Sequence, residues 1–365
     1  MKKIVYSGFY GFKNTGDDAF LEVSAWGSKE FFNTTNTVFL GHGLPKLLNE
    51  SRELNKSLFK GHNRVQSFKE IMNANYFISA GGSTLSNHRK NSLKEIAELL
   101  KSSFNKKLKT GAIGVSIGPF KNGVEEENVI EYLKRINFLA LRDKRSYEYA
   151  SSLNLPYLPI QAFDLAALLP LVYKDEPKTK TIVNQKLVGV SVCPYESITN
   201  INKIENENHR INSTVELLKN LNRRVEDITF RFFIINGHST IGDEKITKKV
   251  IKMSGIKKFE IIPYQNSVVN TWNFIGECDF MIATRLHAAI FSAYNKVPFI
   301  LIEYHRKCTD FLNDIGQLKS LYVKDAEYNS NLIDKIEAIL NEKNDFILSN
   351  IDSTKEMALR NFAIL

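Results

Sequence analysis

The sequence predicts an α/β protein of two Rossmann-like domains, each built around a parallel sheet. Along nearly the whole chain, apolar runs of strand length alternate with segments in which apolar residues recur every three or four positions. The chain has 365 residues, which is more than one compact core usually holds. The alternation stops once, in a polar stretch, and then starts again. Together these observations predict two domains of ordinary size.

The first domain is predicted to span residues 1–172 and to contain five strands. They are KIVYSGF (3–9), TVFLG (37–41), YFISAGG (76–82), TGAIGVSIG (110–118) and FLALRD (138–143). Helical periodicity predicts helices between them, among them residues 18–32, 92–104 and 126–136. This order indicates parallel strands joined by crossover helices.

A linker and a second domain follow. Residues 173–186 show neither period and contain Pro177 among charged residues, which is typical of an exposed linker. The second domain, 187–330, has strand candidates LVGVSVC (187–193), ITFRFFII (228–235), FEIIP (259–263), DFMIA (279–283) and VPFILIE (297–303). Residues 331–365 are predicted to form helices that pack back on the first domain.

Composition limits the partners. With 49 Lys and Arg against 40 Asp and Glu, the net charge is +9, which favours anionic ligands. The basic residues are scattered and do not form runs interleaved with aromatic residues, so no nucleic-acid partner is expected.

Cysteine usage and hydropathy indicate the compartment. Cys193, Cys278 and Cys308 are too widely spaced for a disulfide framework or a metal site, and no signal peptide precedes the first strand. No apolar run approaches the roughly 18 residues that cross a bilayer. We therefore expect a cytoplasmic protein whose membrane contact, if it has one, is peripheral at the inner face.

The most informative stretch is residues 281–316, because two adjacent turns after predicted strands carry cationic and proton-exchanging groups. They are Arg285, His287, Tyr304, His305, Arg306 and Lys307. Open α/β sheets bind ligands at such positions, so we predict a site for an anionic small molecule. Arginine binds carboxylate or phosphate through two hydrogen bonds, histidine exchanges a proton near neutral pH, and lysine adds a point charge. The alternative for His287 is a packed or capping residue.

Glycine-rich turns in the first domain are further candidates. In GFYGFKNTGDDAF (8–20), Gly11 and Gly16 allow a close backbone approach before a helix, and Asn14 and Asp17 lie beside them. The spacing is not the dinucleotide fingerprint and no Walker lysine follows. A tight structural turn is the alternative.

Three other features of the first domain have both a binding and a structural interpretation. Gly81 and Gly82 end a predicted strand, where small residues leave room for a ligand. Arg142 and Asp143 end another strand as a pair that contacts substrate or holds a loop. Asp164 precedes a short apolar helix and is a candidate for its N-cap or for substrate binding.

An ordered set of motifs resembles the polysaccharide pyruvyl transferase family. The matching segments run from residue 4 to about 316 and are GFYGFKNTGDDAFL, FISAGGSTL, GVSIGPF, LRDKRSYEYASSLNL, FDLA and ATRLHAAIFSAYNKVPFILIEYHRKCTDFLNDIG. The resemblance implies a fold similar to the GT-B glycosyltransferases, with a ligand cleft between the domains. It also implies phosphoenolpyruvate as donor and two hydroxyls of a saccharide as acceptor, in the biosynthesis of cell-surface polysaccharides such as capsule, exopolysaccharide or cell wall. The acceptors it suggests include lipid-linked saccharides.

The resemblance also suggests roles for individual residues. Arg285 would hold the donor's carboxylate or phosphate, His287 would act as general acid or assist phosphate departure, and Lys307 would pair with a donor anion. The first domain would face the acceptor, so its candidate substrate-binding residues are Gly11, Asn14, Gly16, Asp17, Gly81, Gly82, Arg142 and Asp164. The chemistry calls for no metal or redox cofactor.

Two departures from the family pattern stand in the second domain. Cys193 and Tyr195 replace an arginine that often follows its first strand, and Arg306 stands where proline is common. Two alternative functions stay open: a GT-B nucleotide-sugar glycosyltransferase, and a non-catalytic saccharide-binding or assembly protein.

Overall fold

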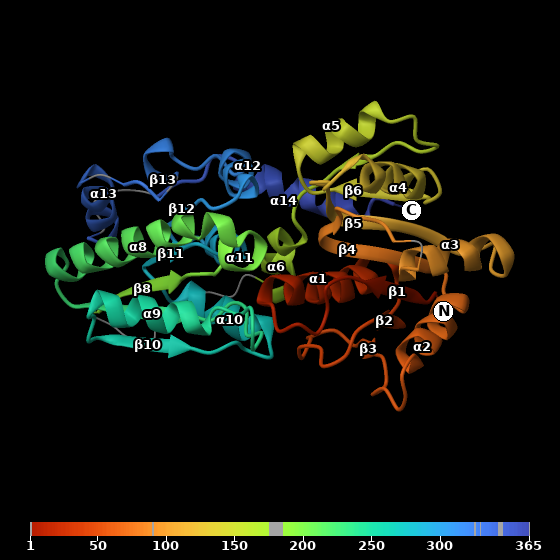
Figure 1. Ribbon diagram of the computed structural model, residues 1–365, viewed down its shortest axis with the longest axis horizontal. Helices are drawn as coiled ribbons and strands as arrows, with labels where there is room; N and C mark the ends of the chain where they lie inside the picture. Colours follow the sequence, from red (N-terminus) through yellow and green to blue (C-terminus); the bar gives the residue numbers. More distant parts are fainter. Residues whose placement is uncertain are drawn as a thin grey trace. The chain divides into compact units, whose positions relative to one another are not determined.

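The computed structural model describes residues 2–89, 91–174, 185–324, 326–328, 330–341 and 346–364. The chain divides into two compact units, and both are of the α/β class (Figure 1). The first unit comprises Met1–Gly11, Asp17–Val172 and Ser353–Leu365, and the second comprises Phe12–Gly16 and Tyr173–Asp352. Most of the expected linker, 173–186, lies outside the described residues, because 175–184 are not among them.

The first unit is a doubly wound parallel sheet. Its strand order is β3-β2-β1-β4-β5-β6-β7, which reverses direction between β1 and β4. The strands are β1 (Ile4–Ser7), β2 (Thr37–Phe39), β3 (Arg52–Glu53), β4 (Tyr76–Leu85), β5 (Lys109–Ile117), β6 (Phe138–Leu141) and β7 (Ile160–Gln161). The helices are α1 (Thr15–Phe32), α2 (His62–Met72), α3 (Leu93–Ser103), α4 (Gly123–Leu133), α5 (Lys144–Ser152), η1 (Leu165–Leu168), α6 (Leu169–Tyr173), α14 (Ile351–Leu359) and η4 (Arg360–Phe362).

The second unit repeats this architecture. Its parallel strands are ordered β10-β9-β8-β11-β12-β13, with the reversal between β8 and β11. The strands are β8 (Lys186–Ser191), β9 (Ile228–Phe233), β10 (Phe259–Ile262), β11 (Phe280–Ala283), β12 (Phe299–Ile302) and β13 (Tyr322–Val323). The helices are α7 (Glu196–Thr199), η2 (Ile201–Lys203), α8 (Ile204–Arg224), α9 (Glu244–Ser254), α10 (Val268–Gly276), α11 (Leu286–Tyr294), α12 (Arg306–Asp314), η3 (Lys319–Leu321) and α13 (Ser330–Leu340).

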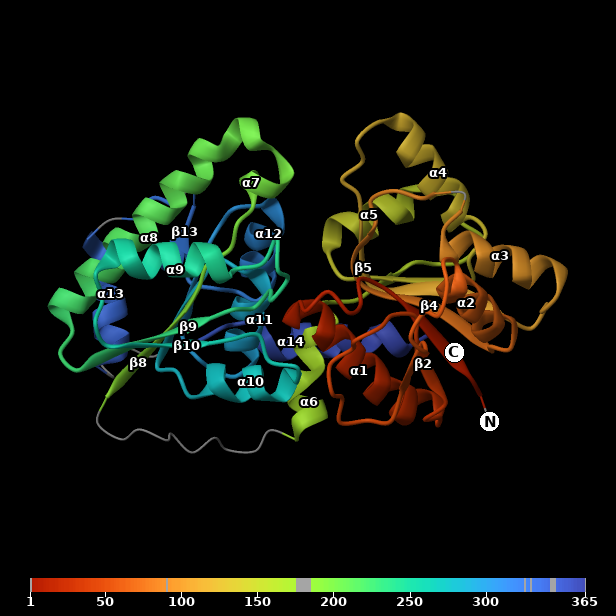
Figure 2. The ribbon, with the colours of Figure 1, turned by 60° about the horizontal axis from the view of Figure 1, so that its bottom comes forward.

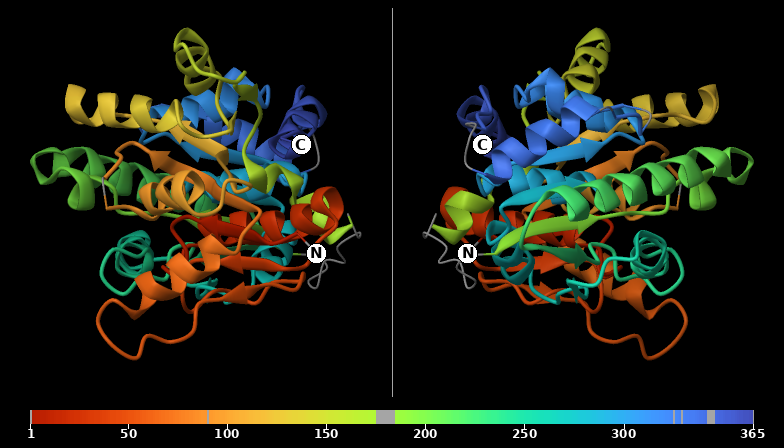
Figure 3. Two further views of the ribbon diagram at one scale, coloured as in Figure 1. Left: turned by 90° about the vertical axis from the view of Figure 1, so that its right-hand side faces the viewer. Right: turned by 90° about the vertical axis from the view of Figure 1, so that its left-hand side faces the viewer.

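Helices cover both faces of each sheet. In the second unit, one core cluster joins α8, α9 and α13 to the strands, while α10 and α11 pack through Trp272 and Phe291 on the other face (Figure 2). The right-hand view of Figure 3 shows α8 in green with α9 in teal next to it. In the first unit, α2 and α3 belong to one cluster and α4 and α5 to another. Burial on both faces explains why strands such as β6, β11 and β12 are continuously apolar.

The predicted α/β class and the ten predicted strands are confirmed, and the differences have local causes. β3, β7 and β13 are two residues long, which is too short to produce a period. β4 was expected to end at Gly82 but continues to Leu85, with a register shift between these two residues. Gly81 and Gly82 therefore lie inside the strand and not at its end.

The two closing helices belong to different units. Leu332, Ile333 and Ile336 of α13 lie in the core of the second unit, although residues 331–365 were all expected on the first domain. Residues from Ser353 onward belong to the first unit. No helix of the described residues is both long and apolar enough to cross a membrane.

A buried asparagine anchors the C-terminal segment of the first unit. Asn361 is fully buried; its Oδ1 accepts a hydrogen bond from the Gly114 backbone N–H at 2.6 Å, and its Nδ2 donates to the Phe163 carbonyl at 2.8 Å. Phe362, next in the chain, stacks on Phe31 of α1 with ring centroids 4.9 Å apart. The end of the chain is thus attached to β5, to the loop before η1 and to α1.

We expect Asn361→Ala to destabilise the protein by on the order of 2–4 kcal/mol, because it leaves a buried N–H and a buried carbonyl without partners. Urea unfolding followed by circular dichroism measures this loss. Asn63→Ala, at an exposed position of α2, is the matched control and should change stability by less than about 0.5 kcal/mol. Equal effects of the two substitutions would contradict the anchoring role.

Candidate functional site

The polar side chains of the second unit gather at one edge of its sheet. All strands of this sheet are parallel, so their carboxyl ends meet at the same edge. The segments that follow them are 193–196 after β8, 236–243 after β9, 284–287 after β11, 303–307 after β12 and residue 324 after β13. The strand order reverses between β8 and β11, which is where doubly wound sheets bind ligands.

Arg285 is held at this point by a buried carboxylate. Its Nε donates to the two carboxylate oxygens of Asp243 at 3.0 and 3.2 Å, and its Nη2 donates to Oδ1 at 2.5 Å. Asp243 is fully buried, and its Oδ2 also accepts from the Asn236 backbone N–H at 2.8 Å. Burial opposes the charge of Arg285, but nearby Cys193 and the Asp243 carboxylate raise its pKa above the ordinary value. Arg285 is therefore a fixed cation.

The side chain of His287 packs against the short segment 12–16. This segment was expected to belong to the first domain. The Thr15 N–H donates to the Ile235 carbonyl at 3.0 Å, and the Gly237 N–H donates to the Lys13 carbonyl at 2.8 Å. Asn14 thereby forms an antiparallel bridge with Asn236. This pairing places 12–16 in the second unit.

The imidazole of His287 leaves no space for a side chain at position 16, so this residue must be glycine. A Cβ at residue 16 would lie 2.1 Å from Nδ1 of His287, a distance that no pair of such atoms tolerates. Only glycine lets the backbone pass so close to the ring. The structure therefore brings Asn14 and Gly16 together with Arg285 and His287.

Lys307 lies beside the aromatic ring of Tyr304. Its Nζ is 5.4 Å from the ring centroid, and the guanidinium carbon of Arg210 is 5.9 Å from the same centroid. Both distances are in the range of cation–π contacts. Burial raises the pKa of the Cys193 thiol to about 12, although the charges of Arg285, Arg210 and Lys307 act to lower it. Cys193, which follows β8, therefore carries a protonated thiol.

Arg142 and Asp164 form a pair with each other in the first unit. Arg142 Nη1 donates to Asp164 Oδ2 at 2.9 Å, and its Nε donates to Ser116 Oγ at 2.8 Å. Asp164 also caps η1 through the Ala166 N–H at 3.0 Å, so its interpretation as an N-cap is confirmed. The expected partner Asp143 instead caps α5 through the Ser146 N–H. The pair ties the loop after β6 to the loop after β7.

Packing accounts for two of the remaining glycines. Gly11 has φ of +80°, and a Cβ there would lie 2.1 Å from the His42 carbonyl oxygen. At Gly81, with φ of +74°, a Cβ would lie 2.1 Å from the ring of Phe20. Gly82 is less crowded, since the Asp17 carboxylate would be its nearest neighbour, at 3.8 Å.

Asp243 and Arg210 are two further candidate residues that the sequence did not predict. Asp243 follows β9 in NGHSTIGDE, and an acidic residue shortly after a strand was the available signal. Arg210 lies within α8, where it is buried and paired with Glu196. A lone arginine inside a helix carries no signal in the sequence, because its partner Glu196 is fourteen residues away, at the start of α7.

The chain is a doubly wound α/β protein with cationic side chains gathered at the topological switch point of its second sheet. The sequence model of one family, polysaccharide pyruvyl transferase, matches residues 14–306. The chain belongs to this family, and it is a transferase of polysaccharide biosynthesis. The resemblance seen in the motifs is thus confirmed.

Solved structures of similar fold include UDP-GlcNAc 2-epimerases and a protein in complex with UDP-glucose. The UDP-GlcNAc 2-epimerase of Neisseria meningitidis bound to UDP-GlcNAc is 9% identical, with a TM-score of 0.56 and 100% of both chains covered. The UDP-GlcNAc 2-epimerase of Methanocaldococcus jannaschii is 13% identical, with a TM-score of 0.55 and 98% of both chains covered. Anabaena HepE in complex with UDP-glucose is 9% identical, with a TM-score of 0.54; 100% of this chain and 94% of that chain are covered. At these identities they show the fold alone, and they confirm its GT-B-like class. No curated protein sequence matches this chain significantly.

We expect Asp243→Ala to destabilise the second unit by on the order of 3 kcal/mol, because removing one partner of a buried ion pair leaves the other uncompensated. Chemical unfolding of the variant measures this. Glu216→Ala, in α8 of the same unit, removes a carboxylate whose side chain is 54% exposed and should cost less than about 1 kcal/mol. If the double variant Asp243→Ala/Arg285→Ala lost the full sum of the two single losses, the two side chains would not be coupled.

Proposed function

We propose that the protein transfers the pyruvyl group of phosphoenolpyruvate to two hydroxyls of a saccharide, forming a pyruvate ketal and releasing phosphate. The observation that carries the proposal is the position of Arg285 and His287 at the switch point of the second sheet in a chain of this family. Lys307 follows the next strand and adds a cation near Cys193. A donor with one carboxylate and one phosphate fits such a set of charges.

The reaction places defined demands on the site. A proton is added to the methylene carbon of phosphoenolpyruvate, and positive charge develops at C2. One sugar hydroxyl forms a bond to C2 and loses its proton; the bond from C2 to the phosphate oxygen then breaks. A second hydroxyl closes the ketal and loses its proton, and the phosphate leaves with one of the two protons released. The reaction therefore requires an acid, a base and cations, and it involves no oxidation or reduction.

Three residues suit these demands. Arg285 uses Nε and Nη2 for Asp243, and its Nη1 has no hydrogen bond to the described residues, so it can donate to a donor anion. His287 is the proton-exchanging group beside it and would protonate the donor or assist the departure of phosphate. Lys307 would neutralise the second anionic group.

The same proposal covers the product, the acceptor and the compartment of the reaction. The product would belong to a cell-surface polysaccharide such as capsule, exopolysaccharide or cell wall, and the acceptor would be a free or lipid-linked saccharide. The reaction would take place in the cytoplasm, with no metal or redox cofactor.

A nucleotide-sugar glycosyltransferase is the second candidate, since structures of the same fold hold UDP-sugars. Thermal unfolding in the presence of ligands separates the two. Our proposal expects stabilisation by phosphoenolpyruvate, and the alternative expects it from a nucleoside diphosphate. A folded protein that no ligand stabilises would favour a non-catalytic role.

We expect His287→Ala to slow phosphate release from phosphoenolpyruvate by on the order of 10²–10⁴-fold, because a general acid contributes about this much. Released phosphate is measured with a panel of glycans that contain galactose, mannose or glucosamine as acceptors, and circular dichroism verifies the fold. Lys258→Ala, on an exposed side chain near the amino ends of the strands, is the control and should retain full activity. Near-normal turnover by the His287 variant would remove this residue from the mechanism.

A further inference from the structure

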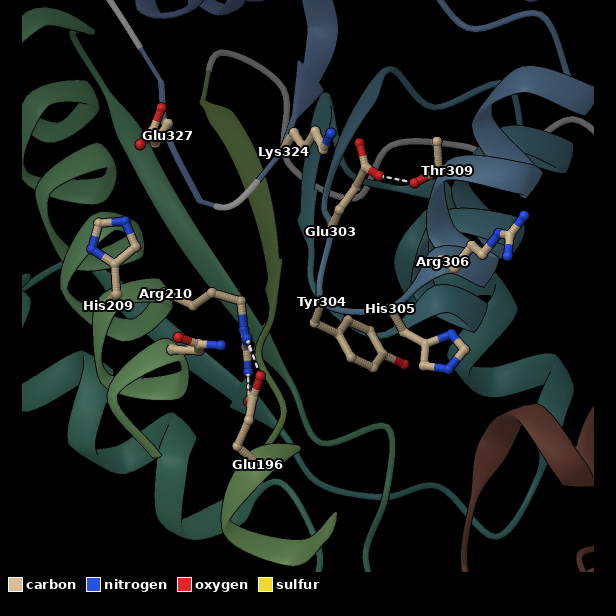
Figure 4. A pocket seen from close by; sticks show the side chains of 11 residues that line it. Glu196, His209, Arg210, Glu303, Tyr304, His305, Arg306, Thr309, Lys324 and Glu327 are labelled. Atoms are coloured by element: carbon tan, nitrogen blue, oxygen red, sulfur yellow. Dashed lines mark hydrogen bonds and ion pairs between the residues drawn. The ribbon is translucent and has the colours of Figure 1, made fainter. Parts of the chain in front are cut away.

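A polar pocket of about 630 Å³ opens within the second unit (Figure 4). One of its lining residues, Tyr304, contacts Lys307 of the proposed donor site. It lies among the residues that follow β12 and β13 and those of α7, α8 and α12. Its volume is within the usual range for ligand sites, about 300–1,000 Å³. None of the residues proposed above for the donor, Arg285, His287 or Lys307, lines this pocket.

The polar groups of the pocket are held in place by other protein atoms. Arg210 and Glu196, both buried, form a two-point ion pair on one side, with Nη1 to Oε1 at 2.9 Å. On another side the carboxylate of Glu303, which is 8% exposed, accepts a hydrogen bond from the Thr309 hydroxyl. Fixed donors and acceptors of this kind orient a ligand without a large entropy cost.

Aromatic rings form a third part of the pocket. Tyr304 lies between Glu303 and His305 in the chain, and its ring is 4.8 Å from that of Tyr195. The Tyr304 ring also contacts Lys307 and Arg210. This ring therefore connects the pocket with a cation of the proposed donor site.

The balance of charge indicates the class of ligand. Three carboxylates, Glu196, Glu303 and Glu327, line the pocket together with three cations, Arg210, Arg306 and Lys324. A strongly anionic ligand such as a nucleoside diphosphate would meet as many negative as positive groups. A polyhydroxylated ligand uses both, because each hydroxyl donates to a carboxylate and accepts from a cation.

We propose that this pocket binds the acceptor saccharide. The inference rests on the proposed function, and it moves the acceptor from the glycine-rich turns of the first unit to the second unit. Packing already explains Gly11 and Gly81. In the second unit the acceptor would lie next to Lys307 and its donor anion, as transfer between the two substrates requires.

The test is saccharide binding in the absence of donor. Methyl glycosides of galactose, mannose and N-acetylglucosamine are titrated into the full chain by calorimetry, and at least one should bind. Glu303→Gln and Lys324→Ala should each weaken that binding about tenfold or more, because each removes a charged hydrogen-bond partner. Lys258→Ala should leave it unchanged, and circular dichroism verifies that all variants fold.

Two outcomes would overturn the pocket as the acceptor site: no glycoside binds, or binding is the same in both pocket variants as in the unmodified chain. Binding of UDP that both variants weaken would assign the pocket to a nucleotide instead. Titration of phosphoenolpyruvate into the same proteins keeps the two proposals separate. If the unmodified chain does not bind phosphoenolpyruvate, the proposed function is refuted. If it binds phosphoenolpyruvate but the pocket variants bind the glycoside as tightly as the unmodified chain, only the assignment of the pocket is refuted.

Residues 54–69 of the first unit combine basic and exposed apolar side chains, and we call them the basic-apolar segment. Its sequence, LNKSLFKGHNRVQSFK, contains four lysines or arginines and no Asp or Glu. Three of its apolar side chains are strongly exposed: Leu58 at 82%, Phe59 at 60% and Val65 at 61%. Exposed apolar side chains interleaved with cations are typical of a membrane-surface site.

The basic-apolar segment presents these side chains on an ordered scaffold. The Asn55 N–H donates to Gln66 Oε1 at 2.9 Å, and Gln66 Nε2 donates to the Asn55 carbonyl at 3.1 Å, which ties the loop to α2 (Figure 1). Val65, Phe68 and Met72 are exposed and spaced three and four residues apart on α2, so they form one stripe. Ile71, on the other face, is fully buried.

We infer that the basic-apolar segment binds the surface of an anionic bilayer. Leu58, Phe59 and the stripe of α2 would enter the interfacial layer, and the cations would approach the lipid phosphates. The charge of the segment complements an anionic lipid surface and not a neutral one. This inference does not depend on the proposed function.

Sedimentation with vesicles tests it. The full chain should bind vesicles that contain phosphatidylglycerol, should not bind phosphatidylcholine alone, and should be released by salt because the charges are exposed. Leu58→Glu/Phe59→Glu should abolish binding. Leu158→Glu, at an apolar side chain that is 89% exposed elsewhere in the same unit, should bind as before. Absence of binding by the unmodified chain, or equal loss in the Leu158 variant, would overturn the inference.

Discussion

The ion pair of Asp243 with Arg285 is the interaction on which the second unit's site depends. It joins the segment after β9 to the turn after β11, across the position at which the strand order reverses. Asp243 is fully buried, so its charge is tolerated only because Arg285 and the Asn236 backbone surround it. The same contacts set the direction of the guanidinium, so this cation of the candidate site is held in one orientation.

A second constraint connects residues that are far apart in the chain. Segment 12–16 pairs with the residues after β9, and this pairing brings Gly16 against the ring of His287. Segment 12–16, although it follows β1 in the chain, thus belongs to the second unit and contributes to its candidate site. The sequence offers Gly16 as part of a glycine-rich turn that approaches a ligand; in the structure this glycine makes room for the imidazole of His287.

The acidic and basic groups of the second unit divide into two sets at the same edge of the sheet. Arg285 and Lys307 contribute cationic side chains and His287 contributes an imidazole, a combination of groups that suits a small anion. The neighbouring pocket has equal numbers of carboxylates and cations and suits hydroxyl groups. Tyr304 touches Lys307 from the first set and Arg210 from the second. One edge of one sheet therefore presents two chemically different surfaces in contact with each other.

The sequence by itself determined the class of fold, the order of strands and helices, and the family, because periodicity and motif order are local properties of the chain. It also offered Arg285 and His287 as candidates, since both lie shortly after a predicted strand. Only the tertiary structure decided the partners: Asp243 for Arg285, Asp164 in place of Asp143 for Arg142, and Glu196 for Arg210. These pairs join segments separated by 14 to 42 positions. Such segments become neighbours only when the strands assemble in their particular order, and no local pattern encodes that order.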